Sequence, residues 1–422
     1  DVVPFVYISY FNYDSMGRLI QADGPRTNVT DTMDFTYYPA ISGDPKSGML
    51  QSVTRTNGTT SLTMIYSDYD SNGNVGRITD FNGRATTYTY NALNRVTAIT
   101  HQADGSTTGY TYDANGNIDL VTLPNGNHID YVYDAAGRLT QITDDLGNSI
   151  RYTYDTQGNM TREERKDPAG AIKTYLDMQY DALNRLKKVI SPDSTFTESS
   201  YDSNGNLTSL TDPRINVTSY EYDALNRLSH MIQPGVINTV LTYDSGDHLT
   251  SVTDGNGNVT TYDYDDAGRV VRLTSSDTGT TAYTYDEAGN LASRKDANNI
   301  LTTYAYDALN RLTAIHFPDS YQDITYTYDD PTLNGKGRLT GMSDPSGTMT
   351  YRYTSKGGLY KEIRTFTGLS GLSYTTTYAY DGNGNLTQIT YPSGSKVTYV
   401  YDTSDRLTVV TGQNGPVIDT LA

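Results

Sequence analysis

The sequence of 422 residues contains no cysteine and no tryptophan, and it has only seven phenylalanines and five histidines. Because cysteine is absent, disulfides, thiol chemistry and thiolate metal sites are all excluded. No segment approaches the run of about 18 apolar residues that marks a transmembrane helix, so we expect no membrane span. The chain begins at Asp1 without a methionine or an apolar leader, which is typical of a processed or truncated product.

Basic residues are also scarce. Lysine and arginine number 31 against 49 aspartates and glutamates, and the net charge is −18. Nucleic acids and anionic membrane surfaces are bound through basic patches, so the composition argues against both as partners. The simplest role of the acidic balance is solubility.

Motifs for catalysis are missing as well. The five histidines are scattered, and no two of them lie at the spacing of metal ligands. The sequence also lacks Gly-x-Ser-x-Gly, Walker and His-Glu-x-x-His patterns. We therefore expect a protein that is not an enzyme and that uses no cofactor.

Tyrosine is the abundant large residue, with 39 copies. Tyrosine and threonine favour strands, and tyrosine keeps a polar end when its ring is covered. The composition therefore predicts an interior made of tyrosine ladders more than of aliphatic side chains.

One heptad organises the chain. Tyr180–Leu186 reads Tyr-Asp-Ala-Leu-Asn-Arg-Leu, with Tyr180, Asp181, Asn184, Arg185 and Leu186 as its defining residues. In the regular copies the fifth position holds only Gly, Asn or Asp, which most readily accept positive φ, and the seventh is apolar. A turn with one left-handed residue between two strands is a β-hairpin corner. The seventeen copies begin at Tyr13, Tyr69, Tyr90, Tyr112, Tyr133, Tyr154, Tyr180, Tyr201, Tyr222, Tyr243, Tyr264, Tyr285, Tyr306, Tyr380 and Tyr401, with degenerate copies at Tyr328 and Tyr353.

The heptads recur mostly every 21 residues, which is room for two strands of about six residues and two turns. The repeat predicts an all-β fold, a spiral and solenoid-like array of about seventeen hairpins. Residues 69–410 form the regular array. Residues 1–68 are expected to be divergent repeats or a cap with an apolar leading segment, and residues 411–422 a tail.

The two strands of a hairpin differ in their patterns. Tyr131 and Tyr133 lie two apart and share one face of the entering strand. On the leaving strand the apolar residues Leu139 and Ile142 lie three apart, which puts them on opposite faces unless a bulge intervenes. A bulge and a strand covered on both faces are both compatible with this spacing.

The heptads resemble the YD repeats of the Rhs family, from Tyr13 and then continuously from Tyr69 through Leu407. Similar repeats form the teneurin shell and the wrapping components of bacterial ABC toxin complexes. The resemblance implies a β-hairpin ribbon coiled side by side into a spiral sheet, which can close into a hollow shell, or cocoon, around a toxin. It also implies an extracellular or cell-surface location, in a bacterium.

Four corners read Asp-x-Asn-Gly-Asn and carry oxygen atoms at alternate positions, as calcium loops do. They lack the glycine and the distal glutamate of an EF-hand, and Asn-Gly is itself a hairpin turn signal, so a turn is the preferred interpretation. The calcium candidates are Asp70, Asn72, Asp113, Asn115, Asp202 and Asn204.

Two other recurring features have structural and functional interpretations. The Asp and Arg of each heptad are expected to join turns, because a lattice needs one pair per unit whereas an active site needs one copy. Sequons for N-linked glycan arise partly from the heptad itself. Their glycosylation would require a competent secretory host. They lie at Asn28, Asn57, Asn159, Asn206, Asn216, Asn258 and Asn385.

An array of like units is typical of a structural material. The first hypothesis is an extracellular structural protein that assembles end to end into a filament or forms a spiral shell. Self-association would then use the sheet ends and the apolar segment Val2–Ile8. The alternatives are a segment of an Rhs-type cocoon that encloses a toxin, and an adhesion or carbohydrate-binding module.

Overall fold

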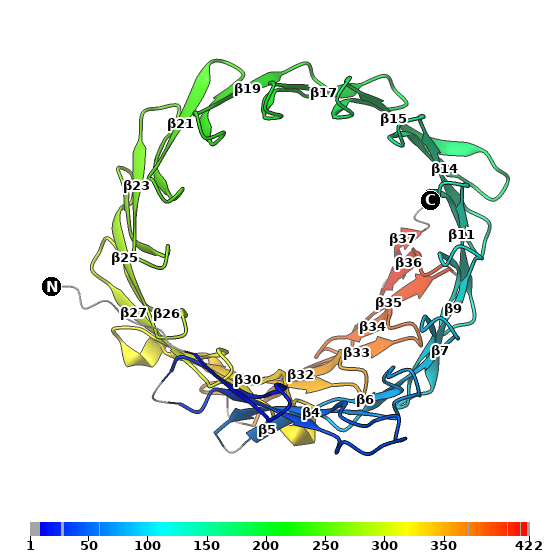
Figure 1. Cartoon of the computed structure of the whole chain (residues 1–422). Coiled ribbons are helices and arrows are strands. Elements are labelled where there is room, and N and C mark those ends of the chain that lie inside the picture. The colour runs from blue at the N-terminus through cyan, green and yellow to red at the C-terminus, as the bar shows by residue number, and fades with distance from the viewer. Residues whose placement is uncertain are drawn as a thin grey trace. The chain divides into compact units, whose positions relative to one another are not determined.

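A computed structural model describes residues 9–26, 29–58, 60–369, 371–402, 404–413 and 415–419. These residues form one sheet of 37 strands with two short 3-10 helices, η1 (Ser320–Gln322) and η2 (Pro331–Leu333). Within the described part of the chain, no helix is long and apolar enough to cross a membrane. The predicted all-β array of repeated hairpins is confirmed (Figure 1). The apolar segment Val2–Ile8 and the sequon at Asn28 lie outside the described residues.

The strands are β1 Tyr10–Tyr13, β2 Leu19–Asp23, β3 Thr32–Tyr37, β4 Leu50–Asn57, β5 Thr60–Ser67, β6 Arg77–Thr79, β7 Ala85–Tyr90, β8 Val96–His101, β9 Ser106–Tyr112, β10 Ile118–Thr122, β11 His128–Tyr133, β12 Leu139–Asp144, β13 Ser149–Tyr154, β14 Met160–Lys166, β15 Ile172–Tyr180, β16 Leu186–Ile190, β17 Phe196–Tyr201, β18 Leu207–Thr211, β19 Val217–Tyr222, β20 Leu228–Gln233, β21 Ile237–Tyr243, β22 Leu249–Thr253, β23 Val259–Tyr264, β24 Val270–Ser275, β25 Gly279–Tyr285, β26 Leu291–Lys295, β27 Leu301–Tyr306, β28 Leu312–His316, β29 Ile324–Tyr328, β30 Leu339–Asp344, β31 Gly347–Tyr353, β32 Leu359–Phe366, β33 Ser373–Tyr380, β34 Leu386–Thr390, β35 Lys396–Tyr401, β36 Leu407–Gly412 and β37 Gly415–Asp419.

Contacts divide the chain into two compact units. Unit 1 comprises residues 1–128, 285–293 and 301–422, and unit 2 comprises residues 129–284 and 294–300. The boundaries expected from the sequence at residues 68 and 410 remain predictions. Each unit is built from the same hairpin.

Each hairpin closes through a corner that one left-handed residue makes possible. In the repeat of β11 and β12, the N–H of Asp134 donates to the carbonyl of Arg138 and the N–H of Gly137 to that of Asp134, both at 2.9 Å. Gly137 has φ 77°, and Asn184, at the same position of its own repeat, has φ 61°. The predicted positive φ of the fifth position is therefore confirmed.

A β-bulge after the corner explains the period of three. Tyr133 pairs with Leu139, but Val132 pairs with Gln141, so the register shifts by one residue on the leaving strand. As a result Leu139 and Ile142 both come to lie opposite tyrosines, because Ile142 pairs with Tyr131. The bulge, and not a strand covered on both faces, accounts for the spacing.

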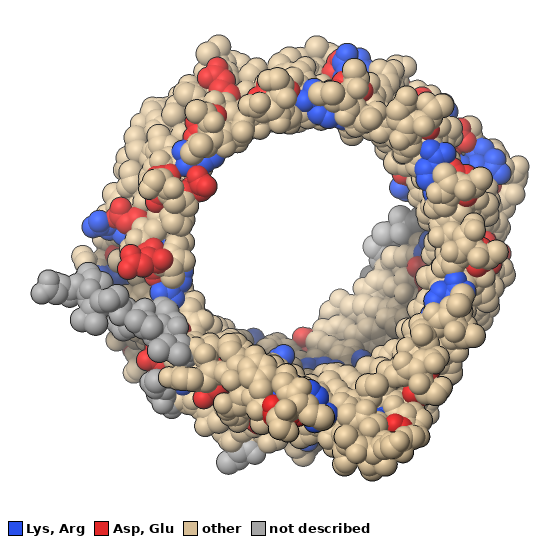
Figure 2. Space-filling model, viewed as in Figure 1, with Lys and Arg blue, Asp and Glu red and all other residues tan. Residues whose placement is uncertain are grey.

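The sheet has almost no aliphatic core. Among the described residues, the buried apolar side chains are Leu62, Ala308 and Ala314, whereas the tyrosines of the strands are mostly half-buried. The charged side chains of both signs are interspersed, and the face seen in Figure 2 carries no extended basic patch. The three buried residues all belong to unit 1, where two parts of the chain meet.

In unit 1, hairpins about 250 residues apart lie side by side. The turns between β4 and β5, β6 and β7, and β10 and β11 of a first layer meet the corners between β27 and β28, β29 and β30, and β33 and β34 of a second layer (Figure 1). Asn57 contacts Asp307, Asn82 contacts Lys336, and Asn125 contacts Asn383, at sequence separations of 250, 254 and 258 residues. We call this line of contacts the seam. It brings later repeats back beside earlier ones, as a spiral array requires.

Candidate functional site: corners and seam

The aspartate that begins most corners holds the turn through backbone N–H groups, and Asn91 and Thr354 stand at this position in two others. Oδ1 of Asp181 accepts hydrogen bonds from the N–H groups of Leu183 (2.8 Å) and Arg185 (3.0 Å). Oδ2 accepts from Nε of Arg185 at 2.7 Å. The hydrogen bond from the backbone N–H of Arg185 is the largest cause that lowers the pKa of Asp181 below its usual value.

Where a corner has an arginine, this side chain also joins its repeat to the next. Nη1 of Arg185 donates to the carbonyl of Asp202 at 2.8 Å, and its guanidinium lies 4.7 Å from the centre of the Tyr201 ring. The Tyr201 hydroxyl in turn donates to the carbonyl of Leu186 at 2.8 Å. We call this Asp–Arg–Tyr arrangement the corner staple. The same stacking of arginine on the next tyrosine occurs in the pairs Arg95–Tyr112, Arg138–Tyr154, Arg185–Tyr201, Arg227–Tyr243, Arg311–Tyr328 and Arg338–Tyr353.

Apart from the degenerate copy at Tyr353, which has Gly358 there, the repeats without arginine keep a side-chain donor at the sixth position of the heptad. His248 stands there in one corner, with Nδ1 3.0 Å from Oδ2 of Asp244 and its ring stacked 4.8 Å from that of Tyr264. In the corners that carry asparagine, such as Asn206, Nδ2 donates to the corner aspartate, here Asp202, at 2.9 Å. The staple therefore tolerates several residue types, provided that each can donate to a carboxylate.

The calcium candidates lie in separate corners, and their oxygens take part in the turns. Oδ1 of Asp70 accepts from the N–H groups of Asn72 and Asn74, and Oδ2 accepts from Nδ2 of Asn74, each at 2.9 Å. Asp113 and Asp202 are bonded in the same way within their own corners. In the parts of the chain that the structure describes, no three His, Asp or Glu residues gather into a metal-binding group. That these corners are turns without a bound calcium ion stays a prediction.

The amides of the described sequons are engaged in hydrogen bonds. Nδ2 of Asn57 donates to Asp307, and Nδ2 of Asn216 donates to Asp212. Glycosylation would replace a hydrogen of these amides, and it stays a prediction. The amides of the other described sequons likewise donate to the first aspartate of their own turns, at Asn159, Asn206, Asn258 and Asn385.

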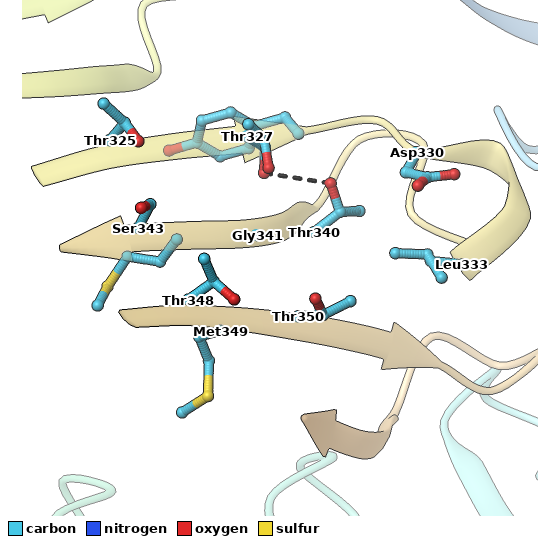
Figure 3. Close-up of a pocket in the computed structure, with 12 residues that line it drawn as sticks. Thr325, Thr327, Asp330, Leu333, Thr340, Gly341, Ser343, Thr348, Met349 and Thr350 are labelled. Carbon is cyan, nitrogen blue, oxygen red and sulfur yellow. Dashed lines mark hydrogen bonds between the residues drawn. The ribbon is translucent and has the colours of Figure 1, made fainter. Parts of the chain in front are cut away.

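An open groove of ≈ 460 Å³ crosses β29, β30 and β31. Figure 3 shows threonines along its strands, among them Thr325, Thr327 and Thr348, and the hydroxyl of Thr340 donating to the carbonyl of Thr327 at 3.2 Å. Asp330 is the one charged residue of the described lining, and it caps η2. The groove offers hydroxyl groups but no acid–base pair.

A largely buried ionic cluster lies where a corner meets the seam. Arg311 donates to Asp307 through Nε at 2.7 Å and to both oxygens of Asp329, at 3.0 and 2.5 Å. Burial disfavours its charge, but the hydrogen bonds to Asp329 and Asp307 outweigh burial and raise the pKa of Arg311 above its usual value. From the first layer, Nδ2 of Asn57 donates to Asp307 at 3.1 Å.

Sequence reasoning placed the corner residues but missed the seam. Asn57 was identified only as a sequon, and Asn82 and Lys356 were not identified at all. Lys356 pairs with Asp104 at 2.6 Å across the seam. The Asn-Gly pairs were a visible signal for turns, but no local pattern tells which turn meets which corner 250 residues away.

Contacts that recur in many repeats and that join repeats to one another define a structural lattice. The corner staples link hairpins along the sheet, and the seam links layers of hairpins in unit 1. Fold and site together therefore define the class of this chain as a structural β-repeat protein.

The chain belongs to the teneurin YD-shell family, whose pattern it matches over residues 40–233 and 234–411. It is similar in structure to the crystal structure of TcdB2-TccC3, with TM-score 0.74 and 16% identity over 96% of this chain and 26% of that chain. The TcdB2-TccC3-Cdc42 crystal structure matches with TM-score 0.74 and 15% identity, over 98% of this chain and 29% of that chain. The structure of the Photorhabdus luminescens Tc holotoxin pore matches with TM-score 0.60 and 16% identity, over 96% of this chain and 24% of that chain.

At these identities the solved structures share the fold. The chain spans about a quarter of the length of the solved chains it matches. No curated protein matches the sequence. The resemblance to YD repeats that the heptads indicated is thereby confirmed at the level of the family and of the fold.

Proposed function

We propose that this chain is a wall segment of an extracellular spiral shell that encloses a cargo polypeptide. The observation that carries the proposal is the seam, in which the turns of one layer bind the corners of the next through Asn57, Asn82 and Lys356. A wall that grows by adding layers needs such contacts between layers as well as the staples within them.

The wall has a mechanical and not a catalytic role. The staples recur in many repeats, and the groove over β29 to β31 lacks an acid–base pair. Family membership and the structural likeness to the Tc holotoxin pore support a shell that holds a toxin-like cargo outside the cell that makes it. The absence of cysteine suits a wall that folds in oxidising surroundings without mispairing.

Electron microscopy of the native material tests this function. The expected result is hollow particles whose walls show layered strands, with a cargo polypeptide that resists protease until the wall is opened. Solid or unlayered particles without a protected polypeptide would overturn the proposal.

A filament is the second candidate, and the sheet ends favour it. β1 pairs with β2 on one side and β37 with β36 on one side, so among the described strands each of them leaves a free edge. Joining through these ends and Val2–Ile8 would make end-to-end polymers. Deleting residues 1–9 should then shorten or abolish filaments seen by negative stain, and unchanged filaments would exclude end joining by this segment.

A further inference from the structure

The seam uses a specific recognition of corners by asparagine. Nδ2 of Asn57 donates to Oδ2 of Asp307 at 3.1 Å, while Oδ1 of Asn57 accepts from the N–H of Ala308 at 3.3 Å. The Asn82 amide makes the same two-pronged contact with the carbonyl and N–H of Lys336, both at 3.1 Å. We call such an asparagine a hook, and the corner groups that it binds a socket.

The socket of Ala308 exists in two further copies, at Ala182 and Ala224, which are exposed and which no other part of the described chain covers. Residues 181–185 and 223–227 repeat the sequence Asp-Ala-Leu-Asn-Arg of residues 307–311. Ala308 is only 8% exposed, whereas the leucines beside the two other sockets, Leu183 and Leu225, are 67% and 65% exposed.

The backbone N–H that a hook binds is unused in both of these sockets. Within the described residues, the structure gives no hydrogen-bond partner to the N–H of Ala182 or of Ala224. Each corner aspartate, in contrast, is bonded as in the seam, since Asp181 and Asp223 accept from their own arginines. The sockets are therefore folded and vacant.

Proline usage supports a role for this N–H group. We call the turn that joins one hairpin to the next, at the opposite strand ends from the corners, the second turn. Several second turns have the same backbone hydrogen bonds as the corners. None of the described corners with those bonds has proline at its second position, although proline fits that position of a turn well. Second turns of the same geometry do have proline there, at Pro124, Pro168, Pro192, Pro213 and Pro392.

Vacant hooks lie on the opposite edge of unit 2. Asn256 and Asn298 are exposed and occupy the third position of their second turns, as Asn82 does in the seam. Their backbone N–H groups donate to Asp254 and Asp296, which fixes the turns. Among the described residues, their side-chain amides have no partner.

We propose that unit 2 carries two complementary docking edges for a second copy of this chain, with hooks at Asn256 and Asn298 and sockets at Ala182 and Ala224. Hooks of one copy enter sockets of the next, which repeats the seam between molecules. The contact is head to tail, so it extends the wall by one layer per copy. This inference rests on the proposed function as a wall and names the surface through which the wall grows.

Sedimentation velocity of the full chain tests the docking. Because each copy has a net charge of −18, the measurement is made at about 0.5 M salt, where repulsion between copies is screened. The expected result is species larger than the 46.5 kDa monomer that increase with protein concentration. The double variant Ala182→Pro/Ala224→Pro removes two N–H donors and should weaken association about tenfold or more. Ala182→Ser/Ala224→Ser keeps both donors and should associate like the parent.

Mixing two variants tests the polarity of the contact. Ala182→Pro/Ala224→Pro and Asn256→Ala/Asn298→Ala should each associate about tenfold or more weakly than the parent when alone, whereas an equimolar mixture keeps one intact interface and should give dimers and nothing longer. Circular dichroism checks that both variants remain folded. A parent that stays monomeric, or proline and serine variants that associate equally, would overturn the docking edges. Those results leave the layered wall of the single chain to be judged separately by microscopy.

Discussion

Replacing the arginine of the seam corner should destabilise unit 1 far more than the same change in an identical heptad of unit 2. The side chain of Arg311 is 18% exposed, and its partners Asp307 and Asp329 are 8% and 5% exposed. Arg227 has an equivalent place in the heptad, but its partner Asp247 is 71% exposed. The two sites share a sequence and differ in burial.

The magnitude follows from what Arg311→Met leaves behind. The carboxylates of Asp307 and Asp329 lose the guanidinium N–H donors of Arg311 in a largely buried site. Removing one partner of such a buried cluster costs about 3 to 5 kcal/mol of stability. Because the cluster is not fully buried, we expect the low end, about 3 kcal/mol. In Arg227→Met the partner carboxylates of Asp223 and Asp247 are already reached by water. The loss of stability should therefore be clearly smaller than in Arg311→Met.

Urea unfolding followed by circular dichroism measures the difference, and hydrogen exchange of peptides spanning residues 307–340 and 223–250 locates it. Adding Asp329→Asn to Arg311→Met removes one unpaired charge and should restore part of the stability. Equal losses at positions 311 and 227 would refute the claim that burial in the seam sets the strength of the staple.

Three further predictions concern the corners in general. Asn184 has φ 61°, so Asn184→Gly should be nearly neutral, whereas Asn184→Val should cost about 1 to 2 kcal/mol in urea unfolding without abolishing any activity. Stability should be constant near neutral pH and fall below about pH 4, because folding lowers the pKa of corner aspartates such as Asp134 beneath 3.8 and that stabilisation is lost as they protonate. It should also fall above about pH 10, because burial raises the pKa of tyrosines such as Tyr222, and that of Tyr378 to about 12, so that ionisation favours unfolding; a pH series of melting temperatures checks both limits. Calcium followed by a chelator should leave the melting temperature unchanged, because the oxygens of Asp70 already accept three hydrogen bonds, and a drop on chelation would reveal a bound ion.

The local structure could be predicted from the sequence because its causes are local. The residue type at Asn184 fixes the left-handed position, and the spacing of Leu139 and Ile142 pointed to the bulge as one of two alternatives. The degenerate copy at Tyr328 shows where the pattern was interrupted without being lost. Residues 331–337 interrupt the corner there, yet the carbonyl of Arg338 still accepts a hydrogen bond from the N–H of Asp329, and the Arg338 guanidinium still stacks over the Tyr353 ring.

The seam could not be predicted because it depends on the whole path of the chain. A turn such as that of Asn82 meets Lys336 only after the small rotations of many successive hairpins have accumulated. The heptad at Tyr306 is identical to that at Tyr222, so nothing within it distinguishes a covered corner from an exposed one. Burial of Ala308 is therefore a property of the array and not of its repeat.

Cross-linking across the seam tests the layered array most directly. The chain has no cysteine, so Asp104→Cys with Lys356→Cys introduces a single pair. In the parent chain, Nζ of Lys356 lies 2.6 Å from Oδ2 of Asp104 across the two layers. A short bis-maleimide should close this pair into a covalent loop within one chain, which denaturing electrophoresis detects. The control pair Asp104→Cys with Lys396→Cys should not react across the seam. Efficient closure of the first pair alone is the predicted result, and no closure, or equal closure of both pairs, would contradict the layered spiral.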